Sequence, residues 1–186
     1  MSKIRFIPTA LKGLFIVEPQ PFRDCRGSFA RVFCKEEFRA VGLTKEIIQA
    51  NHSITVAKGG VRGMHYQNPP YAEAKVIKCL RGKVFDVAVD IRAGSPTFLQ
   101  WVGVELSAQK GNAVYIPEGF AHGFQTLEEN SEMLYMHTQA YTPAYEGAIR
   151  YNDPKVKIEW PLPIGDVSDR DKNHPLLGED FKGIRL

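Results

Sequence analysis

Residues 111–124 read GNAVYIPEGFAHGF, and this stretch decides the fold. Its first part, AVYI (113–116), is a short apolar run of the kind that forms a buried strand. Pro117 and Gly119 follow within IPEG and favour a tight turn, because proline fixes one backbone angle and glycine tolerates left-handed conformations. We expect that turn to direct His122 into the interior of a β-barrel.

Outward from this stretch, most of the chain reads as short strands separated by turns. Breaks such as KGGVRG, RAGSPT and QKGN contain Gly or Pro, and many short strands at regular spacing imply a β-sandwich or a β-barrel. We expect a short helix at residues 35–42, ended by Gly42. A tail from about residue 154 should wrap as loops and a short helix. Examples of the expected strands are residues 47–56, 75–80, 83–91, 98–106, 113–116 and 132–141.

Strand periodicity assigns side chains to faces, because successive residues point to opposite sides of a sheet. Within residues 84–91, the odd-numbered positions are apolar, whereas Asp86 and Asp90 share the other face. Tyr135 and His137 likewise share one face of their strand. Such polar faces either line a ligand cavity or meet solvent, and the pattern alone leaves both readings open.

The bulk composition excludes several classes of protein. The 186 residues fit one domain, 1–186, and a chain of this length buries a core without disulfides or a structural metal. The net charge of +3 is small and dispersed, which argues against nucleic-acid binding and suits an anionic ligand. Three cysteines without a CxxC pair argue for a reducing compartment. We find no signal peptide and no run of ~18 apolar residues, so we expect a cytoplasmic protein away from membranes.

Two histidine motifs resemble those of the cupin superfamily, whose members fold as a double-stranded β-helix, or jelly roll. The spacing from Gly111 to His122 resembles the second cupin motif. The stretch around His65 resembles the first, but Gln67 stands where a metal-binding cupin has a second histidine. A transition-metal site needs several converging imidazole or carboxylate ligands. We therefore expect an all-β cupin jelly roll with a few short helices and no metal.

A longer string, VRGMHYQNPPYAEAK (61–75), is similar to the dTDP-4-dehydrorhamnose 3,5-epimerase family. IPEGFAHGF, DCRGSFAR, QANHS, VFDVAVDIR, YNDP, IEWP and VSDRD extend this resemblance in order, from about residue 4 to residue 176. The resemblance implies a nucleotide-sugar substrate, no cofactor, and a homodimer with exchanged N-terminal strands.

The same resemblance implies the functional residues. The catalytic residues would be His65, Tyr135, Asp171 and Lys75. The substrate-binding residues would be Arg26, Gln49, Asn51, Arg62, His122, Glu146 and Arg170.

These residue types suit inversion of a carbon next to a carbonyl group. In a 4-keto-6-deoxyhexose, the C4 ketone acidifies the hydrogens at C3 and C5, and histidine is a base of suitable pKa to remove them. In the family pattern His65 is that base, Asp171 fixes its tautomer, and Tyr135 supplies a proton from the opposite face. We expect nearby cations to lower the pKa of the tyrosine. Lys75 is our candidate for stabilising the enolate oxygen.

Some positions depart from the family pattern and leave alternatives open. Arg31 stands where glutamate is usual, His137 where a small residue is common, and Arg170 where lysine is usual. The main reading is the 3,5-epimerase reaction, and a related epimerase acting on a GDP- or CDP-linked sugar, or at one centre only, is the alternative. A metal cupin oxygenase and a non-catalytic sugar-binding cupin are further candidates. Retention of the histidine and the tyrosine favours the two epimerase readings.

Overall fold

The computed structural model describes residues 3–186, and strands predominate within them. The strands are β1 (Ile4–Pro8), β2 (Phe15–Pro19), β3 (Phe22–Asp24), β4 (Gly27–Phe29), β5 (Gln49–Thr55), β6 (Val61–Gln67), β7 (Lys75–Arg81), β8 (Lys83–Asp90), β9 (Trp101–Ser107), β10 (Ala113–Ile116), β11 (Phe120–Thr126), β12 (Ser131–His137) and β13 (Glu146–Ala148). The helical segments are α1 (Lys35–Arg39), the 3-10 turn η1 (Pro143–Tyr145) and α2 (Asp169–Lys172). The prediction of an all-β fold with a few short helices is confirmed.

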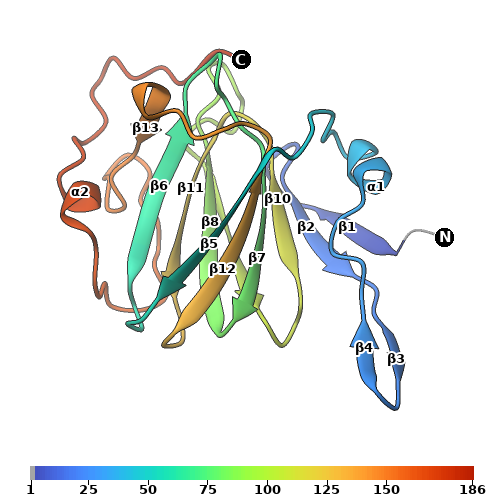
Figure 1. Cartoon of the computed structure of the whole chain (residues 1–186). Coiled ribbons are helices and arrows are strands. Elements are labelled where there is room, and N and C mark those ends of the chain that lie inside the picture. The colour runs from blue at the N-terminus through green and yellow to red at the C-terminus, as the bar shows by residue number, and fades with distance from the viewer. Residues whose placement is uncertain (1–2) are drawn as a thin grey trace.

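The strands form two sheets that face each other as the walls of a flattened barrel (Figure 1). The first sheet has the order β1-β2-β10-β7-β12-β5, and the second has the order β13-β6-β11-β8-β9. The named strands pair antiparallel throughout. The β3–β4 hairpin belongs to neither sheet and extends away from the barrel (Figure 1).

Apolar side chains fill the space between the two sheets and also cover their outer faces. The interior cluster joins Ile77 and Val114 of the first sheet to Ala88 and Phe124 of the second. A second cluster packs the outer face of the first sheet against Phe38 of α1. A third packs the outer face of the second sheet against the C-terminal part of the chain. Both faces of each sheet are therefore partly buried, which is why the strands lack a simple polar outer face.

Strand β8 shows how the two faces are used. Val84 and Ala88 point into the interior cluster. Val87 and Val89 point outward and pack beneath the C-terminal segment. Asp86 shares the inward face and is buried, so the polar face of this strand does not meet solvent. The sequence pattern predicted the alternation of faces correctly, but it did not decide whether the polar face lines the interior or meets solvent.

Three predicted elements differ from the structure by three or more residues at one end. The helix ends at Arg39 rather than at Gly42, although Gly42 does adopt the positive φ expected after a helix, at 104°. The strand expected from residue 98 begins at Trp101, because Leu99 has a φ of 62° and interrupts extended backbone. The strand expected to reach residue 141 ends at His137. The remaining residues of that stretch form the loop that leads to η1.

The C-terminal tail lies along strand β6 and carries α2 with it (Figure 1). The backbone N–H of Val61 donates to the carbonyl of Asp166 at 2.8 Å, and Val61 also forms a parallel bridge with Val167. Gly165 donates to the carbonyl of Gly59 at 2.8 Å. These bonds fix the tail immediately before α2, so that the helix begins beside β6.

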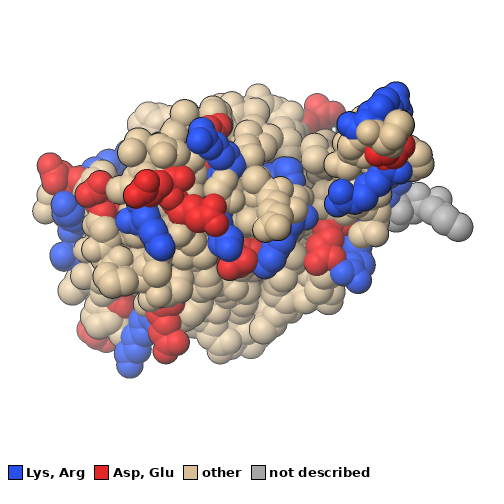
Figure 2. Space-filling model, turned by 90° about the horizontal axis from the view of Figure 1, so that it is seen from below, with Lys and Arg blue, Asp and Glu red and all other residues tan. Residues whose placement is uncertain are grey.

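The face of the molecule in Figure 2 carries basic and acidic side chains next to one another rather than a continuous basic stripe. Exposed ion pairs of the molecule include Lys110–Glu105 and Lys35–Glu46. No helix among residues 3–186 is long and apolar enough to cross a membrane.

Candidate active site

A cavity of about 960 Å³ opens between the two sheets, beside α2 and the segment before it. Strands β5, β6, β11 and β12 supply most of its wall, and the C-terminal tail closes one side. Nine of the predicted site residues line it. They are Asn51, Arg62, His65, Lys75, His122, Tyr135, Glu146, Arg170 and Asp171.

The side chains of His65 and Asp171 meet in the wall of this cavity. The Nε2 atom of His65 lies 2.8 Å from Oδ1 of Asp171. The aspartate side chain is 5% exposed, whereas that of the histidine is 31% exposed and faces the cavity. When Nε2–H donates to the carboxylate, the neutral ring keeps its lone pair on Nδ1. The pair therefore presents one defined basic nitrogen.

Local structure fixes the carboxylate of Asp171. Ser168 caps α2, and its hydroxyl accepts a hydrogen bond from the Asp171 N–H at 3.1 Å. The second carboxylate oxygen, Oδ2, accepts a hydrogen bond from the Gly63 N–H at 3.3 Å. Burial opposes ionisation of this carboxyl, but the hydrogen bonds from His65 and Gly63 hold its pKa below the ordinary value. Asp171 is therefore an anion over the neutral pH range.

Gly63 also permits the close packing of β6 on β11. A Cβ atom at this position would lie 2.5 Å from Cα of Gly123 and 2.8 Å from the carbonyl oxygen of His122, and φ is +123°. Glycine is the residue that accepts both the contact and the backbone angle. The RGMH sequence thus lets His65 and His122 lie opposite each other on neighbouring strands.

Tyr135 projects from β12 into the same cavity. Its hydroxyl forms a hydrogen bond of 2.9 Å with the Ser53 hydroxyl on β5. Burial raises the pKa of the phenol strongly, and the hydrogen bond to Ser53 offsets only part of this effect. The expectation that cations lower this pKa is wrong, because loss of solvent outweighs the attraction of Arg62. The phenol is a neutral group that can donate a proton.

His122 belongs to a second histidine–aspartate pair, deeper in the barrel. Its Nε2 atom lies 2.8 Å from Oδ2 of Asp86 on β8, and the two side chains are 6% and 1% exposed. Burial lowers the pKa of His122, and the attraction of Asp86 opposes that shift. The turn IPEG does direct His122 inward, as its sequence predicted. Asp86 was assigned only to a polar strand face by sequence, and its histidine partner could not be foreseen.

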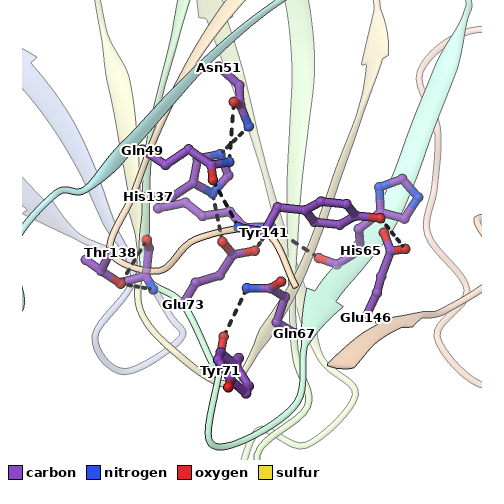
Figure 3. A network of polar contacts seen from close by, with 12 residues as sticks. Gln49, Asn51, His65, Gln67, Tyr71, Glu73, His137, Thr138, Tyr141 and Glu146 are labelled. Atoms are coloured by element: carbon purple, nitrogen blue, oxygen red, sulfur yellow. Dashed lines mark hydrogen bonds and ion pairs between the residues drawn. The ribbon is translucent and has the colours of Figure 1, made fainter. Parts of the chain in front are cut away.

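The two predicted arginines of the cavity wall belong to separate hydrogen-bonded groups. Arg62 donates from Nε to the Thr55 hydroxyl at 2.9 Å. Arg170 forms an ion pair with Glu146, and the Tyr141 hydroxyl donates to the same carboxylate at 3.0 Å. Figure 3 shows Tyr141 reaching across toward Glu146. Both arginines line the cavity with their side chains partly exposed, where a polar ligand could reach them.

Two predicted residues lie outside the cavity wall. The Gln49 side chain forms hydrogen bonds to residues near the cavity. It donates to the Asn51 side chain at 3.3 Å and accepts from the Tyr141 N–H at 3.0 Å (Figure 3). Arg26 sits at the tip of the β3–β4 hairpin, where its guanidinium pairs with Asp24 and is 85% exposed. Within its own chain, Arg26 is not brought together with the other site residues.

Sequence reasoning missed Glu73 as a site residue. Its carboxylate lines the cavity and contacts both Lys75, at 3.0 Å, and His137, at 2.8 Å. The sequence did point to His137 as a residue near the site, because it shares a strand face with Tyr135 and departs from the family pattern. No sequence feature identified its acidic partner.

One group of potential metal ligands is present among residues 3–186. It consists of His65, Asp171 and His174, whose ligand atoms lie within 4.8 Å of one another. The Nε2 atom of His174 is buried without a hydrogen-bond partner, 3.8 Å from Oδ1 of Asp171. A metal ion at this group would have to replace the existing hydrogen bond between His65 and Asp171. The absence of a metal and of a cofactor stays a prediction of the sequence.

The jelly-roll fold places this chain in the cupin class, and its cavity brings together side chains that suit proton transfer. The family model described as dTDP-4-dehydrorhamnose 3,5-epimerase matches residues 8–179. The chain therefore belongs to the dTDP-4-dehydrorhamnose 3,5-epimerase family, and the predicted family and fold are confirmed.

Three relatives illustrate the range of this family. The dTDP-4-dehydrorhamnose 3,5-epimerase of Salmonella typhimurium is 45% identical over 175 residues, which cover 93% of this chain and 95% of the relative. A dTDP-6-deoxy-D-glucose-3,5-epimerase from Legionella pneumophila, solved in complex with dTDP-4-keto-L-rhamnose, has a TM-score of 0.91 and 40% identity, with 98% of each chain covered. The dTDP-4-dehydrorhamnose 3-epimerase of Streptomyces niveus is 37% identical over 177 residues, with 95% of this chain and 85% of the relative covered.

Proposed function

We propose that this chain inverts C3 and C5 of dTDP-4-dehydro-6-deoxy-D-glucose and so forms dTDP-4-dehydro-L-rhamnose. Membership of the family supports a nucleotide-sugar substrate, and the Salmonella typhimurium relative is named for this double inversion. The observation that carries the proposed chemistry is the 2.8 Å contact between His65 and Asp171, in a cavity that Tyr135 also lines.

Each inversion begins with proton transfer from carbon to His65. The lone pair on Nδ1 takes the hydrogen next to the ketone, and the electron pair of the C–H bond moves into an enolate. Negative charge develops on the C4 oxygen, while the imidazole becomes an imidazolium. The ionised carboxylate of Asp171 stabilises that imidazolium and prevents the ring from rotating.

The second half of each inversion needs a cation and a proton donor. The Lys75 ammonium lines the same cavity, and a compact positive charge suits the enolate oxygen. Tyr135 then delivers its phenolic proton to the carbon from the face opposite to His65. Burial keeps the phenol protonated until that step. Exchange with solvent afterwards removes the proton from His65 and returns one to Tyr135.

The dimensions and charges of the cavity fit a sugar nucleotide. A volume of about 960 Å³ is at the upper end of the range of ~300–1,000 Å³ that is usual for small-molecule sites. Arg62 and Arg170 stand at its wall, and their forked guanidinium groups match the oxygens of a diphosphate. Asn51, His122 and Glu146 are the polar groups that we assign to further substrate contacts.

The projecting hairpin supports a homodimer with exchanged N-terminal strands. Phe22 and Phe29 on β3 and β4 are 67% and 75% exposed, an unusual state for large apolar side chains on one short hairpin. A second copy of the chain would cover them. Arg26, at the tip of the same hairpin, would then reach the cavity of the partner rather than its own.

Subunit mixing tests this arrangement of Arg26. Arg26→Ala and His65→Ala should each be nearly inactive alone. A heterodimer of the two has one site with an intact His65 and an intact Arg26 from the partner, so random mixing should restore roughly a quarter of the wild-type activity per chain. If mixing restores nothing while native mass spectrometry of two differently tagged variants shows that heterodimers form, Arg26 does not act across subunits.

The proposed reaction itself is tested by proton exchange with solvent. The protein is incubated with dTDP-4-dehydro-6-deoxy-D-glucose in D₂O, and deuterium is followed by NMR. Label at both C3 and C5, with formation of the L-rhamno product, supports the double inversion. Label at C3 alone supports a one-centre epimerase, the activity for which the Streptomyces niveus relative is named. No label with this substrate, together with exchange of a GDP- or CDP-linked sugar, overturns the assigned nucleotide.

The cytoplasmic location stays a prediction.

A further inference from the structure

A buried charged cluster forms the wall of the cavity on strands β7 and β12. Glu73 stands at its centre, with Oε1 3.0 Å from the Lys75 ammonium and Oε2 2.8 Å from Nδ1 of His137. The three side chains are 9%, 8% and 9% exposed, and all three line the cavity. Figure 3 shows Glu73 pointing toward His137, which in turn points toward Asn51.

The hydrogen bonds of this cluster specify the tautomer of His137. Glu73 can only accept when it is ionised, so Nδ1 of His137 carries the donated proton. The Nε2 atom, 3.3 Å from Nδ2 of Asn51, then accepts from that amide. The amide oxygen of Asn51 accepts from Gln49 in turn. His137 in this arrangement completes an ordered chain of donors that ends on the carboxylate of Glu73.

Electrostatics make Glu73 the essential member. A buried ammonium without a counter-charge tends to lose its proton, because the neutral amine is easier to desolvate. Besides Glu73, the hydrogen-bond partner of Lys75 among the described residues is the His65 carbonyl, at a long 3.5 Å. Burial opposes the charge of Glu73, but His137 and Lys75 hold the pKa of this carboxyl below its ordinary value. The carboxylate is thus present to compensate the ammonium.

The titratable side chains around the ammonium come from four elements. Glu73 precedes β7, His137 and Tyr135 lie on β12, His65 lies on β6, and His122 on β11. Of these, Glu73 supplies the negative charge in direct contact with Lys75.

We propose that Glu73 and His137 are positioning residues that keep the Lys75 ammonium charged and directed into the cavity. Glu73 supplies the counter-charge, and His137 holds the carboxylate in the orientation that Lys75 needs. The catalytic importance of Glu73 and His137 rests on the proposed function, in which the Lys75 ammonium faces the enolate oxygen. The charge of Lys75 in the free protein does not depend on that function.

The variant Glu73→Gln keeps the shape of the side chain and removes its charge. We expect it to exchange substrate hydrogens nearly as fast as the wild type near pH 6 and to lag increasingly as the pH rises, because Lys75 then loses its proton. The ratio of wild-type to variant kcat should grow about tenfold or more between pH 6 and pH 9, since burial can move the titration of a lysine by several pH units. A matched control is Glu105→Gln, which removes the carboxylate of the exposed Glu105–Lys110 pair and should leave the ratio at one.

A second pair of variants tests His137. Asparagine places an amide donor near the position of Nδ1, whereas leucine has a similar bulk and no donor. His137→Asn should therefore follow the wild-type pH profile, and His137→Leu should show part of the alkaline loss seen with Glu73→Gln. Equal profiles for the two variants would overturn the role of His137.

The charge of Lys75 is also measured without substrate. Protein labelled with ¹³C at lysine Cε is titrated by NMR, and the Lys75 signal is assigned as the one that Lys75→Arg removes. In Glu73→Gln this signal should titrate at lower pH than in the wild type, and an unchanged titration would overturn the proposal. If the wild type fails to exchange the dTDP sugar but the titration shifts as expected, the proposed function fails while the pairing of Glu73 with Lys75 stands.

Discussion

His65 Nε2 and Asp171 Oδ1 lie 2.8 Å apart, although 106 positions separate the two residues along the chain. The contact exists because the C-terminal tail pairs with the start of β6 and delivers α2 beside it. The Ser168 cap and the Gly63 N–H then fix the carboxylate from two further directions. Proton transfer at His65 therefore depends on a segment far from it in sequence.

Replacing Asp171 by asparagine should lower kcat for exchange by about 10²–10⁴-fold, because the ring can adopt the wrong tautomer and the imidazolium loses its counter-charge. Binding of the substrate should change much less. The neighbouring Asp169→Asn removes an aspartate that is 97% exposed on the same helix, and it should have wild-type kinetics. Steady-state rates of deuterium uptake measure both variants. Equal losses in the two would show that helix α2, rather than the carboxylate of residue 171, is the sensitive feature.

Tyr135→Phe should separate exchange from inversion. His65 can still remove a proton and return one to the same face, so deuterium uptake should persist, while product of inverted configuration should fall by about 10²-fold or more. The burial that raises the pKa of the phenol also means that its ionisation should not limit the wild type up to its ordinary value of ~10. Tyr115, another buried tyrosine, packs on the outer face of the first sheet and offers the control Tyr115→Phe. NMR of product stereochemistry distinguishes the outcomes, and undiminished inversion in Tyr135→Phe would contradict its role as donor.

Asp90 should contribute to stability in a pH-dependent way. Burial opposes its charge, but hydrogen bonds from Arg92, Ser95 and Thr97 lower its pKa to about 2. A carboxyl with a depressed pKa stabilises the fold fully above its unfolded pKa of ~4 and loses that contribution as the pH falls toward 2, which amounts to about 2 kcal/mol here.

The variant Asp90→Asn should accordingly be less stable than the wild type at pH 7 by about 2 kcal/mol or more. Its free energy of unfolding should also change less steeply between pH 4 and pH 2. Urea titrations at several pH values measure both quantities. A difference between wild type and variant that stays constant down to pH 2 would contradict the assigned ionisation.

Metal ions should inhibit rather than support the reaction. A chelator should leave exchange unchanged, because the proposed steps use only side chains of the protein. Excess Zn²⁺ should slow exchange by competing for His65, Asp171 and His174, whose nitrogen and oxygen ligands suit that ion. His174→Gln should reduce the sensitivity to zinc about tenfold and keep the activity without metal. Loss of activity on chelation, restored by one added metal, would contradict a metal-free mechanism.

The sequence predicted strands β5, β7, β8, β9, β10 and β12 and the residues that short motifs carry. The turn before His122 and the alternating faces of β8 follow from local rules, and the structure has both. The family pattern assigned His65, Tyr135 and Asp171 to one catalytic site, and all three line one cavity. Local rules were sufficient here because the relevant turns and periods span only a few residues.

Two other long-range pairings lay outside both the local rules and the family pattern. Asp86 pairs with His122, and Glu73 with His137, only because particular strands become neighbours. The pKa of Tyr135 was predicted to shift in the wrong direction, since its burial depends on the whole barrel. Leu99 has a positive φ that its residue type gives no reason to expect.

The most direct measurement of the central claim is the rate at which His65→Ala exchanges the C3 and C5 hydrogens of the dTDP sugar with D₂O. The variant should fold, as judged by circular dichroism, and bind the nucleotide sugar, yet show no exchange above the uncatalysed rate at either carbon. Exchange at the wild-type rate in this variant would contradict the account, because another group would then be the base.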